Sequence, residues 1–286
     1  MLVRDALDEA AGSLRAAGVA QPDQDAELLV RHALGWDRAA FLARVGERID
    51  DDTLAALRGL VAQRSRRIPL QHLVGSVEFW KREFLVSPAA LIPRPETELL
   101  VETALLRLAA TPAPRVVDVG TGTGCIALSI AADRPDAEVH AVDVSREALG
   151  LARQNAQRLG LERRVAFHLG DLLQPVLGFA GRVDLLASNP PYVDATEIQG
   201  LAPEVRDHEP RIALVPKGGD RYSIYRRLAP AAAMLLRPRG LLLLEIGQHM
   251  AEEVGRACDA AGMRVEAITR DLQGVPRVMT ARRSSE

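Results

Sequence analysis

The first 75 residues carry apolar side chains at helical spacing. Leucine, valine and alanine recur every three or four positions from residue 2 to residue 17, and Gly18 follows where a helix would end. A second helix is predicted from Pro22 to about Gly35. The acidic run at residues 50–52 suits the start of a third, because the helix dipole favours negative charge there. These segments predict an N-terminal helical bundle over residues 1–75.

Residues 76–93 have a different pattern, in which apolar and polar positions partly alternate. Alternation with a period of two is typical of half-buried strands. The segment is therefore predicted to be a β-hairpin that links two domains.

From residue 94 onward, short apolar runs alternate with amphipathic segments. Seven strands are predicted, at residues 115–119, 138–142, 165–169, 183–188, 241–246, 264–269 and 277–281. Helices are predicted at residues 125–132, 145–159, 222–236 and 248–261. Repeated strand–helix units favour an α/β domain with a doubly wound, mostly parallel seven-stranded sheet. This domain is expected to span residues 94–286.

Composition and charge narrow the class of protein. The chain is 48% apolar and 26% charged, with a formal net charge of −2. A strongly basic surface for nucleic acid is therefore not expected. Cys125 and Cys258 form no CxxC pair, which fits a reducing cytoplasm and disfavours a disulfide framework or zinc cluster. We expect neither a signal peptide nor a membrane span, because no apolar run is long enough.

A glycine-rich loop follows the strand predicted at residues 115–119. Its sequence is Asp118-Val119-Gly120-Thr121-Gly122-Thr123-Gly124, and a helix is predicted directly after it. Glycines at such a turn let a ligand approach the backbone, and Asp143 lies about 20 residues further on, where an acid binds ribose hydroxyls. The GxGxG spacing and the carboxylate of Asp118 favour a loop that faces a cationic amino-acid ligand rather than a pyrophosphate. The alternative is a tight turn without a ligand.

The tetrapeptide Asn189-Pro190-Pro191-Tyr192 follows another predicted strand. Each proline fixes its own φ and restrains the residue before it, so the loop is stiff. Asn189 Oδ1 and a backbone carbonyl of the loop can accept hydrogen bonds from a planar NH₂ group and orient its nitrogen toward a methyl donor. Tyr192 can pack against the planar target. The alternative is a turn punctuated by prolines.

The two motifs together are similar to those of amino-methyltransferases, and the flanking sequence narrows the match. The chain resembles the HemK/PrmC family of release factor glutamine methyltransferases at Gln71–Gly75, Glu78-Phe79, Leu91–Glu98, Glu204–Pro210 and Leu244–Gly247. The segment Pro93-Arg94-Pro95-Glu96-Thr97-Glu98 is the most specific of these. This resemblance covers nearly the whole chain.

The resemblance implies a Rossmann-like class I methyltransferase that uses S-adenosylmethionine. Its implied substrate is the N5 amide of the glutamine in the Gly-Gly-Gln motif of class 1 peptide chain release factors, held in part by the N-terminal domain. The implied catalytic residues are Asn189, Pro190 and Tyr192, and substrate binding also involves Pro191. The implied cofactor-binding residues are Gly120, Thr121, Gly122, Thr123, Gly124, Asp143, Leu172 and Asn189. No metal, membrane or direct nucleic-acid contact is expected, and the chain is expected to be a monomer.

Two positions depart from the family pattern. Leu172 stands where relatives often carry an aromatic residue, and Asp220-Arg221 follows Gly218-Gly219 where relatives commonly have Asp-Gly. The first departure is expected to weaken stacking on the adenine.

Several charged segments have two interpretations each. Arg94, Glu96 and Thr97 either line the cofactor pocket or cap the helix that follows. Residues 204–209 form either a substrate lip or a solvated loop. The cluster of Arg64, Arg66 and Arg67 either touches RNA or protein or ends a helix in solvent. His208 has no His or Cys nearby that would suggest a metal site.

Two functional alternatives remain open at this point. An adenine-N6 DNA or RNA methyltransferase would use the same tetrapeptide, although the balanced charge disfavours it. A non-catalytic protein that binds S-adenosylmethionine would keep the fold, although the intact Asn189 disfavours that alternative.

Overall fold

The computed structural model describes residues 1–284, and these form two compact units. The first comprises residues 1–76 together with residues 202–208, and the second comprises residues 77–201 and the chain from residue 209 onward. The predicted division at residues 75 and 93 did not anticipate that a short segment beyond residue 200 groups with the first unit.

The first unit is helical throughout. Its helices are α1 (Val3–Ala16), α2 (Pro22–Leu34), α3 (Arg38–Arg44), α4 (Asp51–Ser65), α5 (Leu70–Val74) and α9 (Pro203–His208). The side chain of Asp50 accepts a hydrogen bond from Thr53 N at 2.8 Å and so caps α4, while Gly35 ends α2 at φ 64°. Leu14, Leu29 and Leu57 lie in the core of this bundle.

The second unit begins with a two-stranded sheet and continues as a seven-stranded sheet. The pair consists of β1 (Ser76–Phe79) and β2 (Arg82–Leu85). The seven strands are β3 (Arg115–Val119), β4 (Glu138–Asp143), β5 (Val165–Leu169), β6 (Val183–Ser188), β7 (Leu236–Glu245), β8 (Met263–Arg270) and β9 (Pro276–Arg283). The helices of this unit are α6 (Glu98–Leu108), α7 (Cys125–Asp133), α8 (Arg146–Arg158), α10 (Arg211–Leu214), α11 (Ser223–Leu235) and α12 (Ala251–Ala260), with 3₁₀ turns η1 (Pro95–Thr97), η2 (Gln174–Phe179) and η3 (Ile198–Gly200).

The strand order is β5-β4-β3-β6-β7-β9-β8, and β9 runs in the opposite direction to the other strands of this sheet. The chain leaves β3 toward β4 on one side, and β6 then lies on the other side. The direction of winding therefore reverses between β3 and β6, and open α/β sheets bind ligands at the carboxyl ends of the strands at such a point. The expected doubly wound, mostly parallel sheet is confirmed.

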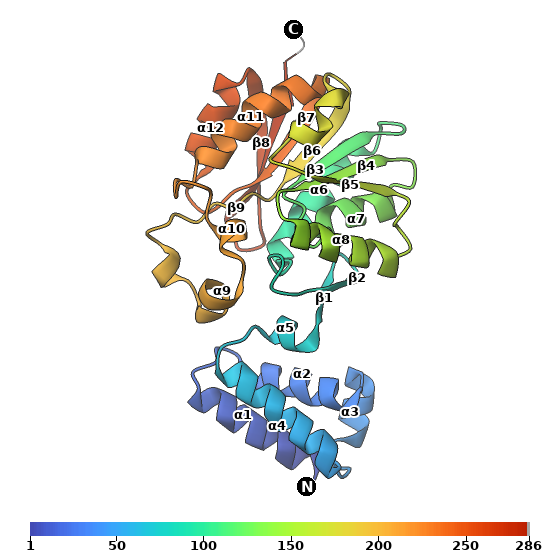
Figure 1. Ribbon diagram of the computed structural model, residues 1–286, viewed down its shortest axis with the longest axis vertical. Helices are drawn as coiled ribbons and strands as arrows, with labels where there is room; N and C mark the ends of the chain where they lie inside the picture. The colour runs from blue at the N-terminus through green and yellow to red at the C-terminus, as the bar shows by residue number, and fades with distance from the viewer. Residues whose placement is uncertain (285–286) are drawn as a thin grey trace. The chain divides into compact units, whose positions relative to one another are not determined.

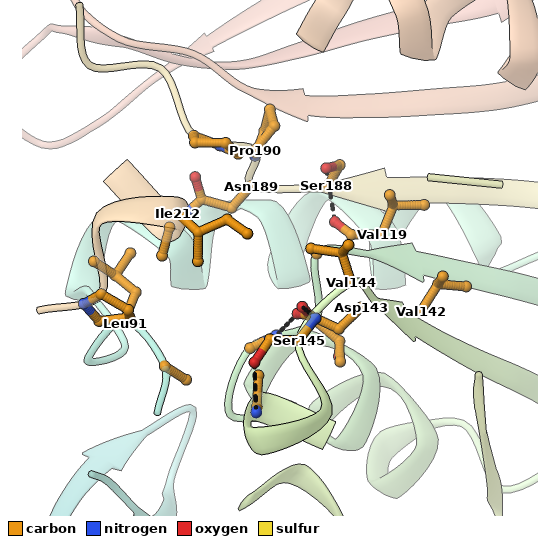
Figure 2. Close-up of a pocket in the computed structure, with 18 of the residues that line it drawn as sticks. Leu91, Val119, Val142, Asp143, Val144, Ser145, Ser188, Asn189, Pro190 and Ile212 are labelled. Carbon is orange, nitrogen blue, oxygen red and sulfur yellow. Dashed lines mark hydrogen bonds between the residues drawn. The ribbon is translucent and has the colours of Figure 1, made fainter. Parts of the chain in front are cut away.

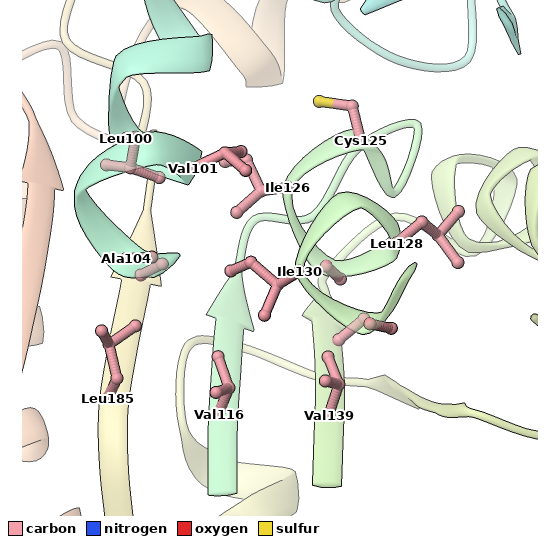
Figure 3. Packing of buried hydrophobic residues seen from close by; sticks show 14 of the residues in the cluster. Leu100, Val101, Ala104, Val116, Cys125, Ile126, Leu128, Ile130, Val139 and Leu185 are labelled. Atoms are coloured by element: carbon pink, nitrogen blue, oxygen red, sulfur yellow. The ribbon is translucent and has the colours of Figure 1, made fainter. Parts of the chain in front are cut away.

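Consecutive strand residues send their side chains to opposite faces of the sheet. Val116 packs under α6 and α7 (Figure 3), whereas Val117 packs with α11 and α12. The two faces therefore have separate hydrophobic cores, and the helices cover both sides of the sheet (Figure 1). Aliphatic side chains from both the strands and the helices form these two cores.

Some boundaries differ from the prediction. β7 starts at Leu236, five residues early, because the chain bulges at Gly240 before it resumes pairing with β6. A Cβ on Gly240 would lie 3.0 Å from the carbonyl oxygen of Val183, so a larger residue would not fit there. α12 starts only at Ala251, because residues 247–250 form a turn first. The short helices α3 and α5 were not predicted.

Among residues 1–284, no helix has both the length and the apolar character that crossing a bilayer requires.

Candidate active site

The site lies where β3 and β6 end side by side. Val119 is the register partner of Ser188, and the hydroxyl of Ser188 donates to the carbonyl oxygen of Val119 at 2.8 Å (Figure 2). The residues that directly follow these two strands are Gly120 and Asn189. A Cβ on Gly120 would lie 4.0 Å from the backbone oxygen of Asn189. The sheet therefore brings the glycine loop and the tetrapeptide together.

The glycine loop requires its glycines for conformational reasons. Gly120, Gly122 and Gly124 have φ values of 71°, 56° and 83°, in the left-handed region that other residues rarely adopt. A Cβ on Gly124 would also lie 2.9 Å from Cδ1 of Leu128 in α7. The backbone can therefore turn tightly between β3 and α7 and leave open space above the loop.

Asp118 lies beneath this loop rather than on its surface. The residue is fully buried, and its Oδ2 accepts from Thr121 Oγ1 at 2.6 Å and from Ala127 N at 3.2 Å. Burial raises the pKa of Asp118 to about 7. Its carboxyl group therefore ties the loop to the first turn of α7. That the loop faces a cationic amino-acid ligand stays a prediction.

Asp143 ends β4 and bridges two backbone segments. Its Oδ2 accepts from Gly122 N at 2.8 Å. Its Oδ1 accepts from Ser145 N at 2.9 Å (Figure 2). Burial raises the pKa of Asp143, whereas the backbone donors lower it. The side chain remains part of the cavity wall and keeps lone pairs for hydroxyl donors.

A cavity of about 460 Å³ connects these elements. Most of the predicted site residues line it: Gly120, Thr121, Gly122, Thr123, Asp143, Leu172, Asn189, Pro190 and Pro191. Gly124 and Tyr192 lie outside its wall. Gly124 is the residue before α7, and the ring of Tyr192 packs against the core on the α11 face.

Tyr192 contacts the turn after β7. A Cβ on Gly247 would lie 3.1 Å from Cδ2 of Tyr192, so only glycine leaves room for the ring. Burial raises the pKa of the Tyr192 phenol to about 12. Its packing against a planar substrate group stays a prediction.

Asn189 is held by a chain of buried hydrogen bonds that sequence reasoning did not find. Its Nδ2 donates to Thr97 Oγ1 at 3.1 Å, and Thr97 Oγ1 donates to Glu245 Oε2 at 2.7 Å. Thr97 and Glu245 are each 2% exposed. Thr97 makes no side-chain cap to α6, so its hydroxyl serves Asn189 and Glu245 rather than the helix. Arg94 and Thr97 line the cavity, as one of the two interpretations expected, whereas Glu96 does not.

Glu245 was missed although the sequence gives a signal. It ends the strand after four consecutive leucines, and an acid at the end of such a buried run requires an explanation. Burial raises the pKa of Glu245 to about 7, whereas the Thr97 bond and the charges of Arg277 and Arg94 lower it.

Leu172 has a backbone conformation that is unusual for its type. Its φ is 51°, and its side chain lies in the cavity wall beside Asp171. Arg221, the other departure from the family pattern, forms ion pairs. Its guanidinium pairs with Glu197 and lies 3.9 Å from the carboxylate of Asp194, both in the loop after the tetrapeptide. A glycine at position 221 would not make these ion pairs.

Residues 204–209 are neither a free lip nor a simple solvated loop. Glu204 pairs with Arg64 at 2.8 Å and with Arg67 at 2.8 Å inside the first unit, so the arginine cluster is not free in solvent. Glu209 is buried, and one of its oxygens accepts from Arg94 at 2.5 Å.

Comparison with known proteins shows which families this chain resembles. The PrmC N-terminal domain family matches residues 5–75, and the methyltransferase small domain family matches residues 95–208. A release factor glutamine methyltransferase from Deinococcus radiodurans is 45% identical over 285 residues, 99% of each chain. Another of that name from Cereibacter sphaeroides is 42% identical over 282 residues, again 99% of each chain. A solved methyltransferase structure from Pyrococcus furiosus has a TM-score of 0.53 at 18% identity, covering 70% of this chain and 88% of that one, which is a likeness in fold. The expected class I methyltransferase fold is confirmed.

Proposed function

The chain belongs to the family of release factor glutamine methyltransferases, and from this premise we propose that it methylates the glutamine of the Gly-Gly-Gln motif in class 1 peptide chain release factors. The methyl group would come from S-adenosylmethionine and go to the side-chain amide N5. The observation that carries the proposal is that the glycine loop and Asn189 meet in one cavity at the ends of β3 and β6.

The residues of the cavity fit this cofactor. Gly120 and Gly122 present backbone without side chains, and Asp143 offers acceptors at the position where a ribose would lie. Val144 and Ile212 (Figure 2) supply apolar surface for a flat base, together with Leu172. We therefore assign cofactor binding to residues 120–123, Asp143, Leu172 and Asn189, and assign to Gly124, outside the cavity wall, the turn into α7. The cofactor supplies an electrophilic methyl group on a sulfonium.

The chain's own contribution is to position the substrate amide. An amide nitrogen is a poor nucleophile because its lone pair is delocalised into the carbonyl. Asn189 Oδ1 and the backbone carbonyl of Pro190 would accept its two protons, which orients the nitrogen and favours positive charge developing on it. Pro190 and Pro191 keep this loop stiff. No strong base is required, because the nitrogen becomes acidic as it is alkylated.

We propose that residues 1–75 form a domain that helps to hold the release factor. Residues 76–93 would link this domain to the methyltransferase domain at residues 94–286. We further propose that the enzyme acts as a cytoplasmic monomer without direct nucleic-acid contact. The β1–β2 pair lies within the proposed linker. A release factor is a protein of the translation apparatus, so its modification fits this location.

Methyl transfer to purified release factor tests the proposal. Radiolabel is expected in the wild-type release factor and not in a version whose Gly-Gly-Gln glutamine is changed to alanine. Asn189→Ala is expected to lose roughly 10²-fold or more in turnover, as for removal of a positioned hydrogen-bonding group, while binding of S-adenosylhomocysteine largely survives. Label in DNA or RNA instead would favour an adenine methyltransferase, and cofactor binding without any turnover would favour a binding protein.

A further inference from the structure

We propose that Thr97 and Glu245 are positioning residues that set the orientation of the Asn189 amide, so that its oxygen rather than its nitrogen faces the substrate. This inference rests on the proposed function, in which Asn189 accepts a hydrogen bond from the substrate amide. It adds two residues, distant in sequence from the tetrapeptide, to the machinery of the site.

The numbers of donors and acceptors on Glu245, Thr97 and Asn189 fix the direction of each hydrogen bond between them. An ionised carboxylate only accepts hydrogen bonds, and a threonine hydroxyl has a single proton to donate. Thr97 Oγ1 lies 2.7 Å from Glu245 Oε2, so that proton goes to the carboxylate. Thr97 Oγ1 can then only accept from Asn189, and the atom 3.1 Å away must be the amide nitrogen. The opposite end of the amide, Oδ1, is directed away from Thr97.

Without this chain, the amide would have little reason to prefer one orientation. Its oxygen and nitrogen have nearly the same size, so a rotation by half a turn exchanges an acceptor for donors at the same place. A rotated Asn189 would place its oxygen against the acceptor lone pairs of Thr97 and present NH₂ to the substrate NH₂. Two donors cannot bond to each other, so that orientation would be unproductive.

The fold builds the chain from three elements. β6 and β7 run parallel with Ser188 opposite Leu244, so the residues that follow, Asn189 and Glu245, leave the sheet side by side. Thr97 belongs to η1, directly before α6. The phenol of Tyr225 donates to the backbone oxygen of Glu245 at 2.8 Å and fixes the end of β7. The hydrogen-bonded series Asn189–Thr97–Glu245, called the relay below, is therefore held at the end of the sheet and not in a mobile surface segment.

Glu245 is an unusual residue to bury for structural reasons alone. Among the residues that the structure describes, Glu245 forms no ion pair, and its side chain accepts a hydrogen bond from the neutral hydroxyl of Thr97. Burying a carboxylate beside a neutral partner is unfavourable, so a purely structural position would be better filled by an apolar side chain. A directional role for the carboxylate explains its presence.

Protonation of Glu245 would reverse the direction of the chain. A protonated carboxyl can donate to Thr97 Oγ1, which frees the threonine proton to donate to Asn189 Oδ1 and turns the amide around. Activity is therefore expected to fall as Glu245 takes up a proton. Burial raises the pKa of this group to about 7, within the range of an ordinary assay. The titratable and charged groups around it are Arg94, Glu96, Cys125, Tyr192, Tyr225 and Arg277.

The experiment compares Thr97→Val, which keeps the shape and removes the hydroxyl, with Thr97→Ser, which keeps the hydroxyl. Thr97→Val is expected to lower kcat on release factor about 10- to 100-fold, because Asn189 loses the bond that fixes its orientation and misplaced groups at a reacting centre cost rate on this scale. KM and the calorimetric Kd for S-adenosylhomocysteine should change less than about threefold, and Thr97→Ser should recover most of kcat. A Thr97→Val enzyme within twofold of the wild-type kcat, or a loss that serine does not recover, would overturn the relay.

Glu245→Gln supplies a second readout that a structural role would not move. A glutamine can offer its oxygen to Thr97 but does not titrate. The wild-type kcat is expected to fall between pH 8 and pH 6, whereas kcat of Glu245→Gln is expected to be the same at both pH values, whatever its absolute level. An unchanged pH profile would contradict the role of Glu245.

A measurement without substrate separates this inference from the proposed function. In ¹⁵N-labelled protein, the side-chain NH₂ signals of Asn189 should shift in Thr97→Val and remain in place in Thr97→Ser. If the wild type does not methylate release factor, the proposed function fails and these signals still decide the relay. If they are unchanged in Thr97→Val, the relay fails whatever the substrate.

Discussion

Ser188 donates its hydroxyl proton to the carbonyl oxygen of Val119 at 2.8 Å, across the central pair of parallel strands. Ser188 is 1% exposed, so this bond is shielded from water. One residue further along each strand, the glycine loop and the tetrapeptide begin. The bond thus joins the two motifs at the point where the direction of winding reverses.

The replacement Ser188→Ala is expected to lower the free energy of unfolding by about 1 kcal/mol, the usual contribution of a buried hydrogen bond. It should also lower kcat severalfold, because Asn189 loses a restraint on its position. Ser129→Ala is the matched control: Ser129 is also fully buried, but its hydroxyl has no partner among the described residues. Denaturant unfolding should show no loss for Ser129→Ala. Equal losses in both variants would mean that the Ser188 bond has no specific role.

The glycine loop gives a second prediction through Gly124→Ala. Alanine at φ 83° costs about 1–2 kcal/mol, and the contact of its Cβ with Leu128 at 2.9 Å adds about 1–3 kcal/mol. Gly150→Ala, in the middle of α8 with open space around it, should instead be neutral or stabilise by up to about 1 kcal/mol. Thermal unfolding of the two variants measures the difference, and a stable Gly124→Ala protein would contradict the described loop.

A buried acid gives the third prediction, which concerns pH. Burial raises the pKa of Asp118 from 3.8 to about 7, so the folded state favours the protonated form. A raised pKa contributes stability that is complete below about pH 4 and is lost as the pH rises through 7. Relative to Asp118→Asn, the wild type should therefore lose about 1–3 kcal/mol between pH 4 and pH 8. Denaturant midpoints of both proteins at several pH values measure this, and a constant difference between them would refute the shift.

The sequence was a good guide where the determinants are local. β3, β5 and β6 have the predicted boundaries because each is a short, largely apolar segment with polar or turn-forming residues on both sides. Asp50, Ser145 and Gly35 act at helix ends as their types suggest. α3 was missed because seven residues give little periodicity, although Asp37 caps it with a bond of 2.7 Å to Ala40 N and could have indicated it.

Contacts between residues that lie far apart in the sequence could not be predicted from it. Thr97 resembles a helix cap in sequence. Only the fold shows that its hydroxyl donates a hydrogen bond to Glu245, nearly 150 positions later. Arg64 and Arg67 resemble a free basic cluster until Glu204 is brought beside them. The cavity itself follows from motif order and strand pairing, whereas these contacts follow only from packing.

The ion pairs of Glu204 give the last prediction. Although burial acts to raise it, bonds from Arg67 and Arg64 lower the pKa of Glu204 to about 2. Its side chain is 16% exposed and that of Arg64 is 7% exposed, so solvent screens the pairs only in part. Glu204→Gln should therefore lower the stability of the first unit by about 1–3 kcal/mol, less than the loss of a fully buried pair.

The pH dependence of this effect has the opposite sign to that of Asp118. A lowered pKa contributes stability that is present above about pH 4.5 and lost as the pH falls toward 2, so the variant and the wild type should converge in acid. Glu9→Gln is the matched control, because Glu9 and Arg58 form an exposed pair, at 41% and 54%, and solvent screens such pairs so that they contribute little to stability. Hydrogen exchange of the α4 amides reports on this unit. Equal protection of α4 in Glu204→Gln and Glu9→Gln would show that Glu204 does not stabilise the helical unit.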